Sequence, residues 1–241
     1  MALSQQQKIE VVKGKCRTDL KFLCTKVLGM TRWSQFHSEL EQNLNGPEDR
    51  KLVLMPRGHQ KTSFISVAWV IQQLLKNPNE TVLIVSAVWD LSRDILRQIS
   101  GYLESGTLPE LFGPFKTPQT YWTKEAIDIR QKTTNTKNPS IRTAGIETGK
   151  TGSHCSLMIF DDIVAAENVT TKDQINKVSN AYRECLPLLD PGGRILMVGT
   201  RWALGDIYGQ IIEKDMNSMN GHVFSSLEER KNWREFAPKW R

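Results

Sequence analysis

One loop of the sequence carries the residue types that bind phosphate groups. It consists of Pro56, Arg57, Gly58, His59, Gln60, Lys61 and Thr62. Phosphate-binding loops combine backbone N–H groups at a helix N-terminus with a lysine for the outer phosphates and a hydroxyl group for Mg²⁺. Lys61 and Thr62 occupy the places of that lysine and that hydroxyl, and Arg57 supplies a second cation for a triphosphate. The loop predicts a nucleotide phosphate site, with a solvent-exposed turn as the alternative.

The loop departs from the common phosphate-loop pattern GxxxxGK[ST]. That pattern would place glycine at positions 55 and 60, where this chain has Met55 and Gln60. Gly58 is the one glycine inside the loop. The pair Lys61-Thr62 is a weak signal when it is taken alone, and a non-hydrolysing scaffold with a degenerate loop stays open as an alternative.

Two adjacent carboxylates, Asp161 and Asp162, follow the apolar run 156–160. A buried strand of an open α/β sheet delivers the residues at its carboxyl end to the ligand-binding edge. There the first acid can hold Mg²⁺, and the second can orient and deprotonate an attacking water. An acidic helix cap is the alternative for such a pair. Such sites more often have glutamate in second place, so the reach of the shorter Asp162 side chain is in question.

A third candidate, Thr200, follows Gly199 at the end of the apolar run 194–199. A small hydroxyl side chain at a strand end can sense a γ-phosphate and transmit its loss to the next segment. Taken by itself, the motif is equally consistent with a strand end followed by a turn.

The apolar runs that precede these candidates alternate with helical patterns. We expect strands at residues 51–55, 81–88, 156–160 and 194–199, and short β segments near 127–130, 140–144 and 222–225. We expect helices within the first thirty residues and at 33–44, 62–76, 91–103, 172–186 and 204–216. This alternation predicts an α/β fold with a parallel sheet, whose carboxyl edge would gather the three candidate motifs.

The composition, with 39% hydrophobic and 24% charged residues, is typical of a folded globular chain. The longest stretch without a charged residue, 62–75, has fourteen residues, and a membrane span needs about 20. No apolar signal region is visible near the N-terminus. The four cysteines (Cys16, Cys24, Cys155 and Cys185) form no CxxC pair, which argues against zinc and disulfides and suits a reducing cytoplasm.

The net charge of +6 is compatible with a nucleic-acid partner but does not require one. Residues 116–151 hold seven basic and three acidic residues, so much of the positive excess lies there. A solvated loop region explains this excess as well as a binding surface does.

Three segments together resemble the large terminase subunit of tailed bacteriophages, the motors that package viral DNA. They are LVLMPRGHQKT, GKTGSHCSLMIFDDIV and PGGRILMVGTRWALGDIYGQ, and the resemblance covers roughly residues 30–215. It implies a P-loop NTPase core of the ASCE (RecA-type) kind with N-terminal helices. It also implies hydrolysis of ATP with Mg²⁺ to drive double-stranded DNA into a procapsid, and the alternative is a helicase-like or other P-loop translocase.

The resemblance implies a role for each candidate residue. Lys61 and Thr62 would be the phosphate-loop pair, and Arg57 the loop arginine. Asp161 would hold Mg²⁺ with Thr62, Asp162 would be the catalytic acid, and Thr200 the coupling residue. Gln35 matches the family's adenine-reading glutamine loosely, and a surface glutamine is the simpler interpretation. Terminases also use an arginine from a neighbouring subunit. The usual slot holds Thr151 here, which leaves Arg142 and Lys150 as the main candidates, before Arg57 in cis and Arg201.

The predicted organisation is an N-terminal helical segment (1–45), an ATPase core (46–227) and a linker (228–241). The family's nuclease domain is expected to be absent, and with it nuclease activity. The implied partners are double-stranded DNA, the portal protein, the small terminase subunit and further copies of the chain in a ring, with no membrane. The implied location is the host cytoplasm, with transient docking on the procapsid.

Overall fold

The computed structural model describes residues 4–56, 58–148 and 152–217 of the 241-residue chain. Its centre is a six-stranded sheet in the order β1-β6-β5-β2-β4-β3. The strands are β1 (Arg50–Leu54), β2 (Val82–Ser86), β3 (Ala126–Ile127), β4 (Ile141–Gly145), β5 (Cys155–Asp161) and β6 (Leu189–Gly199). Neighbouring strands run parallel, except that the short β3 is antiparallel to β4. The predicted α/β class with a parallel sheet is confirmed.

The carboxyl ends of the parallel strands lie level with one another. Leu54 of β1 pairs with Gly199 of β6, and Val198 pairs with Asp161 of β5. Asp161 in turn pairs with Ser86 of β2. The loops that follow β1, β5 and β6 therefore emerge side by side, because adjacent strands are only about 5 Å apart.

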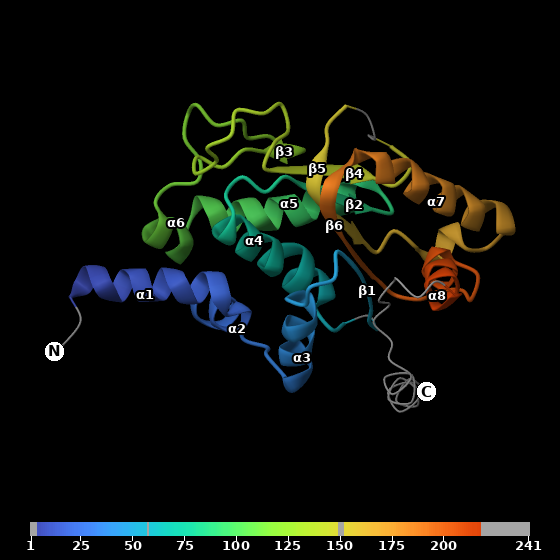
Figure 1. Ribbon diagram of the computed structural model, residues 1–241, viewed down its shortest axis with the longest axis horizontal. Coiled ribbons are helices and arrows are strands. Elements are labelled where there is room, and N and C mark those ends of the chain that lie inside the picture. The colour runs from blue at the N-terminus through green and yellow to red at the C-terminus, as the bar shows by residue number, and fades with distance from the viewer. Residues whose placement is uncertain (1–3, 57, 149–151, 218–241) are drawn as a thin grey trace.

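Helices cover both faces of this sheet (Figure 1). On one face lie α1 (Gln5–Thr18), α2 (Leu20–Phe22), η1 (Leu23–Val27), α3 (Gln35–Leu44), η2 (Thr62–Trp69), α4 (Val70–Lys76), α5 (Trp89–Glu104) and α6 (Thr107–Phe112). On the other lie α7 (Lys172–Cys185) and α8 (Ile207–Asn217), with the short turns η3 (Ala166–Asn168) and η4 (Leu186–Leu188) nearby in the chain.

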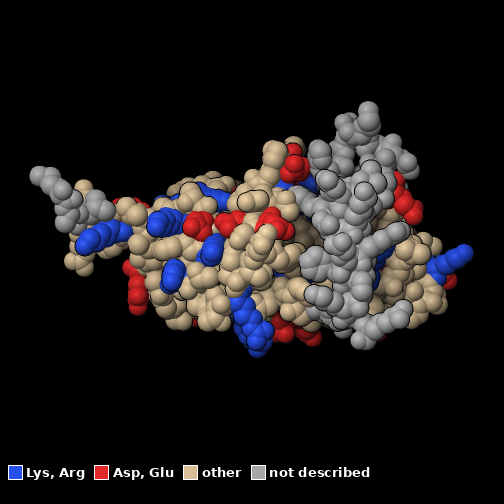
Figure 2. Space-filling model, turned by 90° about the horizontal axis from the view of Figure 1, so that it is seen from below, with Lys and Arg blue, Asp and Glu red and all other residues tan. Residues whose placement is uncertain are grey.

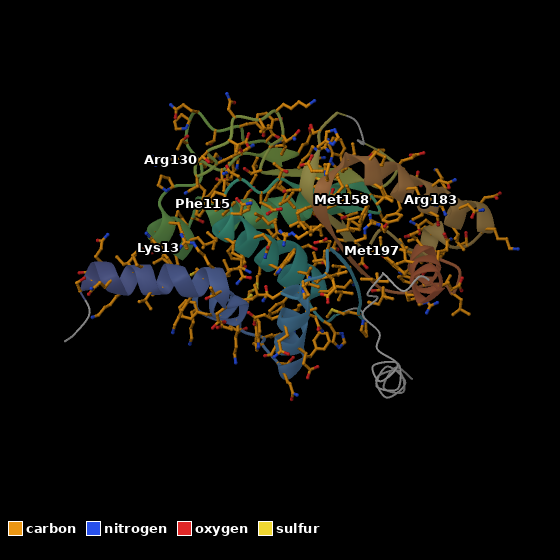
Figure 3. All side chains as sticks on the ribbon, viewed as in Figure 1. Lys13, Phe115, Arg130, Met158, Arg183 and Met197 are labelled. Carbon is orange, nitrogen blue, oxygen red and sulfur yellow. The ribbon has the colours of Figure 1, made fainter. Side chains whose placement is uncertain are left out.

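Alternate strand residues supply the two apolar cores, as the two-residue period of a strand requires. Val53, Ile84, Ile159 and Val198 belong to the larger cluster, which also includes residues of α1, α3, α4 and α5. The smaller cluster includes Met158 and Met197, which lie in the interior of the molecule on neighbouring strands (Figure 3). Both sides of the central strands are thus buried, which explains why their sequences are continuous apolar runs.

Several predicted boundaries were wrong. The strand expected at 194–199 begins at Leu189, because Leu189 pairs with Cys155 before an irregularity that contains Pro191 and Gly192. The helix α6 was not predicted, since Pro109 within it and Pro114 after it suggested a loop. Pro109 lies in the first turn, where its missing N–H costs nothing. The β segment expected near 127–130 is reduced to Ala126–Ile127.

Some of the other expectations concern residues that the structure does not describe, and the rest were met wholly or in part. The β segment near 222–225 and the linker 228–241 lie outside the described residues. Within the predicted N-terminal helix, residues 5–27 are helical apart from Asp19, although in three consecutive pieces rather than one. Within the described ranges, no helix has the length and apolar character that a bilayer crossing demands.

Candidate nucleotide-binding site

The loop after β1 is anchored to the end of β6. The backbone N–H of Met55 donates to the carbonyl of Gly199 at 2.9 Å, and the Thr200 hydroxyl donates to the Met55 carbonyl at 3.1 Å. The loop then runs to the N-terminus of η2, a π-helix that continues into α4. This strand, loop and helix arrangement directs backbone N–H groups and the positive end of a helix toward the carboxyl edge of the sheet.

The backbone conformation of the loop explains its departure from the glycine pattern. Gly58 has a φ of 84° and Gln60 a φ of 54°, so both lie in the left-handed region that favours glycine. Gln60 occupies the second glycine position of the pattern and adopts this conformation at a cost of about 1–2 kcal/mol. Its carbonyl accepts the N–H of Phe64 at 3.0 Å, which starts the helix. The loop therefore has a left-handed turn at Gln60, where the pattern has glycine.

Lys61 lies at the centre of the site. Its side chain is buried, and Nζ lies 2.8 Å from Oδ2 of Asp162. Nζ also donates to the Thr200 hydroxyl at 3.0 Å. Three residues that the sequence placed in separate motifs are thus joined through one ammonium group.

Asp161 is 4% exposed and accepts hydrogen bonds from two hydroxyl groups of η2. Thr62 Oγ1 donates to Oδ1 at 3.0 Å, and the Ser66 hydroxyl donates to Oδ2. Burial raises the pKa of Asp161 to about 6, and the charge of Asp162 adds to this, while the hydrogen bonds and Lys61 oppose it. A buried carboxylate beside a hydroxyl oxygen is a donor set that suits Mg²⁺, so these residues fit the predicted metal site.

Ser66 was missed by the sequence prediction. It follows Thr62 by four residues, which places both hydroxyl groups on one side of the helix. That spacing was the available signal. It carried no weight because Ser66 stands within a run of apolar residues and resembles a filler of the core.

Asp162 follows β5 with a φ of 46°, in the left-handed region. Its Oδ1 accepts the backbone N–H of Thr200 at 3.0 Å, and its own N–H donates to the Val198 carbonyl at 2.8 Å. Aspartate tolerates this backbone conformation better than most residues. The short acid in the second position therefore suits the sharp turn that follows β5.

The segment after Thr200 connects the site to α8. Asp206 is buried and caps the helix, because its carboxylate accepts the N–H groups of Ala203 at 3.2 Å and Gly209 at 2.9 Å. The ring of Tyr208 is buried against Gly199, where any added side-chain atom would collide with it. This close packing explains the glycine at the end of β6.

The remaining candidates are not brought into this cluster. Gln35 is exposed at the start of α3, and its amide donates to Glu39 at 3.1 Å. Arg142 lies within β4, in register with Leu83 rather than at the strand end, and donates to the Ser153 carbonyl at 2.9 Å. Burial lowers the pKa of Arg142. Arg201 donates to the Leu204 carbonyl at 3.2 Å. Arg57, Lys150 and Thr151 lie outside the described residues.

Comparison with known proteins identifies relatives of this chain, although no family model matches it. It is 26% identical over 185 residues to the large terminase subunit of Enterobacteria phage T3, and this match covers 74% of the chain. The match covers 30% of the T3 protein, so the chain corresponds to less than half of that relative.

Solved structures give the same fold. The large terminase of bacteriophage HK97 superposes with a TM-score of 0.57 at 14% identity, covering 88% of this chain and 42% of that one. A variant of the ATPase domain of the Thermus phage P74-26 large terminase superposes with a TM-score of 0.50 at 14% identity, covering 81% of this chain and 74% of that one. The chain is therefore similar in sequence to a large terminase subunit, and it shares the fold of solved large terminases.

Proposed function

We propose that this chain is the ATP-hydrolysing motor domain of a viral DNA-packaging terminase. One observation carries the proposal. At one edge of the sheet, Lys61 Nζ lies 2.8 Å from Asp162 Oδ2 and 3.0 Å from the Thr200 hydroxyl, and Asp162 Oδ1 accepts the Thr200 N–H at 3.0 Å. These three residues are far apart in the sequence. A solvated turn or a helix cap would not require this convergence. The alternative of a helicase-like translocase has less support, because the sequence relative is a terminase.

The residues divide into those that would hold ATP and those that would hold its metal. The backbone N–H groups of the loop and Lys61 would bind the phosphates, and Arg57 would add a second positive charge. Thr62 and Asp161 would hold Mg²⁺. Bound there, Mg²⁺ would neutralise charge on the transferred phosphate. Gln35 stays a loose candidate for adenine contact.

Lys61 and Asp162 have to separate during the reaction. In the present arrangement Lys61 Nζ occupies the Oδ2 atom of Asp162, so that a water molecule would have to compete with it for this oxygen. A phosphate group that attracts Lys61 would release Asp162 to orient and deprotonate the attacking water. The N–H of Thr200 would keep the freed carboxylate oriented through Oδ1. Coupling of phosphate binding to base activation follows from this exchange of partners.

The additional catalytic cation, supplied by a neighbouring subunit or by the same chain, is proposed by comparing the candidate residues. Arg142 is half-buried and bonded within its own chain, and Arg201 is bonded to the following turn. Lys150 in trans and Arg57 in cis are therefore the favoured candidates. Such a group is worth roughly 10³- to 10⁵-fold in rate, so turnover per chain should rise with protein concentration if a neighbour supplies it.

The partners and location follow from the same proposal. They are double-stranded DNA, a portal protein, a small terminase subunit and further copies of the chain in a ring, in the host cytoplasm and at the procapsid. Basic and acidic side chains are intermixed over the described part of the face in Figure 2. Charge on that face therefore does not mark a DNA path, and DNA binding has to be measured.

The decisive experiment compares wild type with Lys61→Ala in ATP binding and turnover, with and without duplex DNA. Lys61→Ala should weaken binding by on the order of 2 kcal/mol and abolish turnover. Unchanged affinity and turnover in Lys61→Ala would refute the phosphate-loop assignment. Stimulation of the wild type by duplex DNA distinguishes a translocase from a non-hydrolysing scaffold, and a cleavage assay on plasmid DNA tests the expected lack of nuclease activity.

A further inference from the structure

A cluster of aromatic rings joins α3 to the phosphate loop. His37 of α3 stacks on Phe64 of η2, with ring centroids 4.2 Å apart and an interplanar angle of 27°. Trp33 packs edge-on against the same Phe64 at 5.0 Å. Phe36 meets His59 of the loop edge-on at 6.3 Å. The start of α3 therefore contacts both the loop and the first turn of the helix behind it.

His37 also caps its own helix through one ring nitrogen. The backbone N–H of Ser34 donates to Nδ1 of His37 at 3.0 Å. A backbone N–H can only donate, so Nδ1 is the acceptor and the proton of the neutral ring is on Nε2. In the protonated ring both nitrogens carry hydrogen, and Nδ1–H would oppose the N–H of Ser34. The Ser34 hydroxyl lies 2.9 Å from the same nitrogen and can accept a hydrogen bond from a protonated ring. Protonation would therefore break the backbone part of the cap, which requires neutral His37, but not the contact with the hydroxyl.

We propose that His37 is a positioning residue that holds the phosphate loop ready for nucleotide, and that protonation of its ring releases the loop. The proposal rests on the proposed ATP site but goes beyond it. Phe64 follows Thr62 by two residues, and its N–H bonds to the carbonyl of Gln60. Fixing Phe64 thus fixes the turn that carries Lys61 and Thr62. Gln60 is in a strained conformation, which persists only where neighbours restrain it.

The surroundings of His37 favour its neutral form. Burial lowers the pKa of His37 from its ordinary value of 6.5; a hydrogen bond with the His59 backbone opposes this, and the charge of His59 lowers the pKa further. The titratable group that faces His37 from the loop is His59, whereas η2 presents the uncharged ring of Phe64. Because the folded pKa is depressed, the stabilising cap is present above pH 6.5 and is lost as the pH falls through the folded pKa.

Two substitutions at His37 test the stacked ring and the helix cap one at a time. His37→Gln keeps a side-chain acceptor for the Ser34 N–H, as in a capping box, but removes the stacked ring. His37→Phe keeps a ring against Phe64 but cannot be protonated. His154→Gln is the matched control, because His154 is 53% exposed and lies 3.9 Å from Asp190, away from the loop. Binding of Mg²⁺-ATP is measured by calorimetry from pH 8 to pH 5.5, with thermal melting to verify that each protein is folded.

At pH 8, His37→Gln should bind ATP about three- to tenfold more weakly than wild type, the factor expected for loss of an aromatic pair. His37→Phe keeps a ring against Phe64 but has no acceptor for the Ser34 N–H, so at pH 8 it should bind ATP about as weakly as the acidified wild type. The wild type should lose more affinity on acidification than either variant, and His154→Gln should follow the wild type.

Wild-type affinity in His37→Gln, or an equal acid loss in wild type and His37→Phe, overturns this proposal. Lys61→Ala, measured in parallel, distinguishes a failure of the proposed role of His37 from a failure of the proposed ATP site. If Lys61→Ala weakens binding and abolishes turnover while His37→Gln leaves both intact, only the role of His37 is refuted. If Lys61→Ala binds and hydrolyses ATP normally, the proposed function itself fails.

Discussion

Replacing Asp162 with asparagine tests the exchange of partners at Lys61. Asparagine has nearly the same shape, tolerates the left-handed backbone at this position and can still accept the Thr200 N–H through Oδ1. Its amide nitrogen, however, would face the Lys61 ammonium as a second donor. The variant therefore removes one ion pair and one base while the turn after β5 is kept.

The size of the effect follows from the exposure of the pair. The Lys61 side chain is 8% exposed and that of Asp162 is 33% exposed, so the pair is stronger than a surface ion pair but screened on one side. We expect its loss to destabilise the nucleotide-free protein by about 1 kcal/mol. Since ATP no longer has to break the pair, its affinity should rise about fivefold. Loss of a positioned base should lower turnover by roughly 10²- to 10⁴-fold.

Three measurements on one preparation give these quantities: urea unfolding without nucleotide, calorimetry with Mg²⁺-ATP, and steady-state phosphate release. Asp94→Asn is the control, because it breaks an exposed Asp94–Arg97 pair of 3.0 Å on α5 and should change none of the three by much. The reasoning is refuted if Asp162→Asn turns over ATP at the wild-type rate. Weaker ATP binding by this variant would contradict the exchange of partners in particular.

Three further results are expected. Asp161→Asn should abolish Mg²⁺-dependent binding but stabilise the nucleotide-free protein at pH 8, because the folded pKa of about 6 exceeds 3.8 and stability falls as the pH rises between them. The gain should be on the order of 3 kcal/mol, and melting curves that vary identically with pH in both proteins would contradict this. Gly199→Ala should cost about 1–3 kcal/mol in urea unfolding, since a methyl group collides with Tyr208; an unchanged midpoint would show that the ring can move. Gln60→Gly should relieve about 1–2 kcal/mol of strain and cost about 0.5–1 kcal/mol in the conformational entropy of the unfolded chain. The free energy of unfolding should therefore stay equal or rise slightly, and ATP binding should be retained. A clear loss of stability or of ATP binding would mean that the Gln60 side chain is needed.

The core of the fold could be predicted because its signals are local. Buried parallel strands have continuous apolar sequences, and the residues with useful chemistry come directly after them. Lys61, Asp161 and Thr200 were predicted as site residues in this way, and the parallel register brings the ends of the neighbouring strands to one edge. Boundaries were less accurate where partners decide them, as at Leu189, whose strand begins early because it pairs with Cys155.

The parts that could not be predicted depend on contacts between distant segments. Ser66 looks like any small residue of a buried helix until Asp161 is placed beside it. His37 looks like a helix-surface residue until Phe64 lies against its ring. The left-handed turn at Gln60 has no sequence signal, because the restraint comes from its surroundings rather than from glycine. Such features need the assembled structure.

The strand order gives Thr200 its importance. Because β6 lies between β1 and β5, the residue at its end reaches the loops of both neighbours. Its hydroxyl bonds to the Met55 carbonyl and to Lys61, and its N–H bonds to Asp162. If Lys61 leaves Asp162 for a phosphate group, the surroundings of both residues change. The bonds of Thr200 to Lys61 and to Asp162 are then both affected. Gly199 leaves no room against Tyr208, so a shift of this strand end has to be passed to α8 rather than absorbed locally. The end of β6, which contacts Lys61 and Asp162, is therefore mechanically joined to α8.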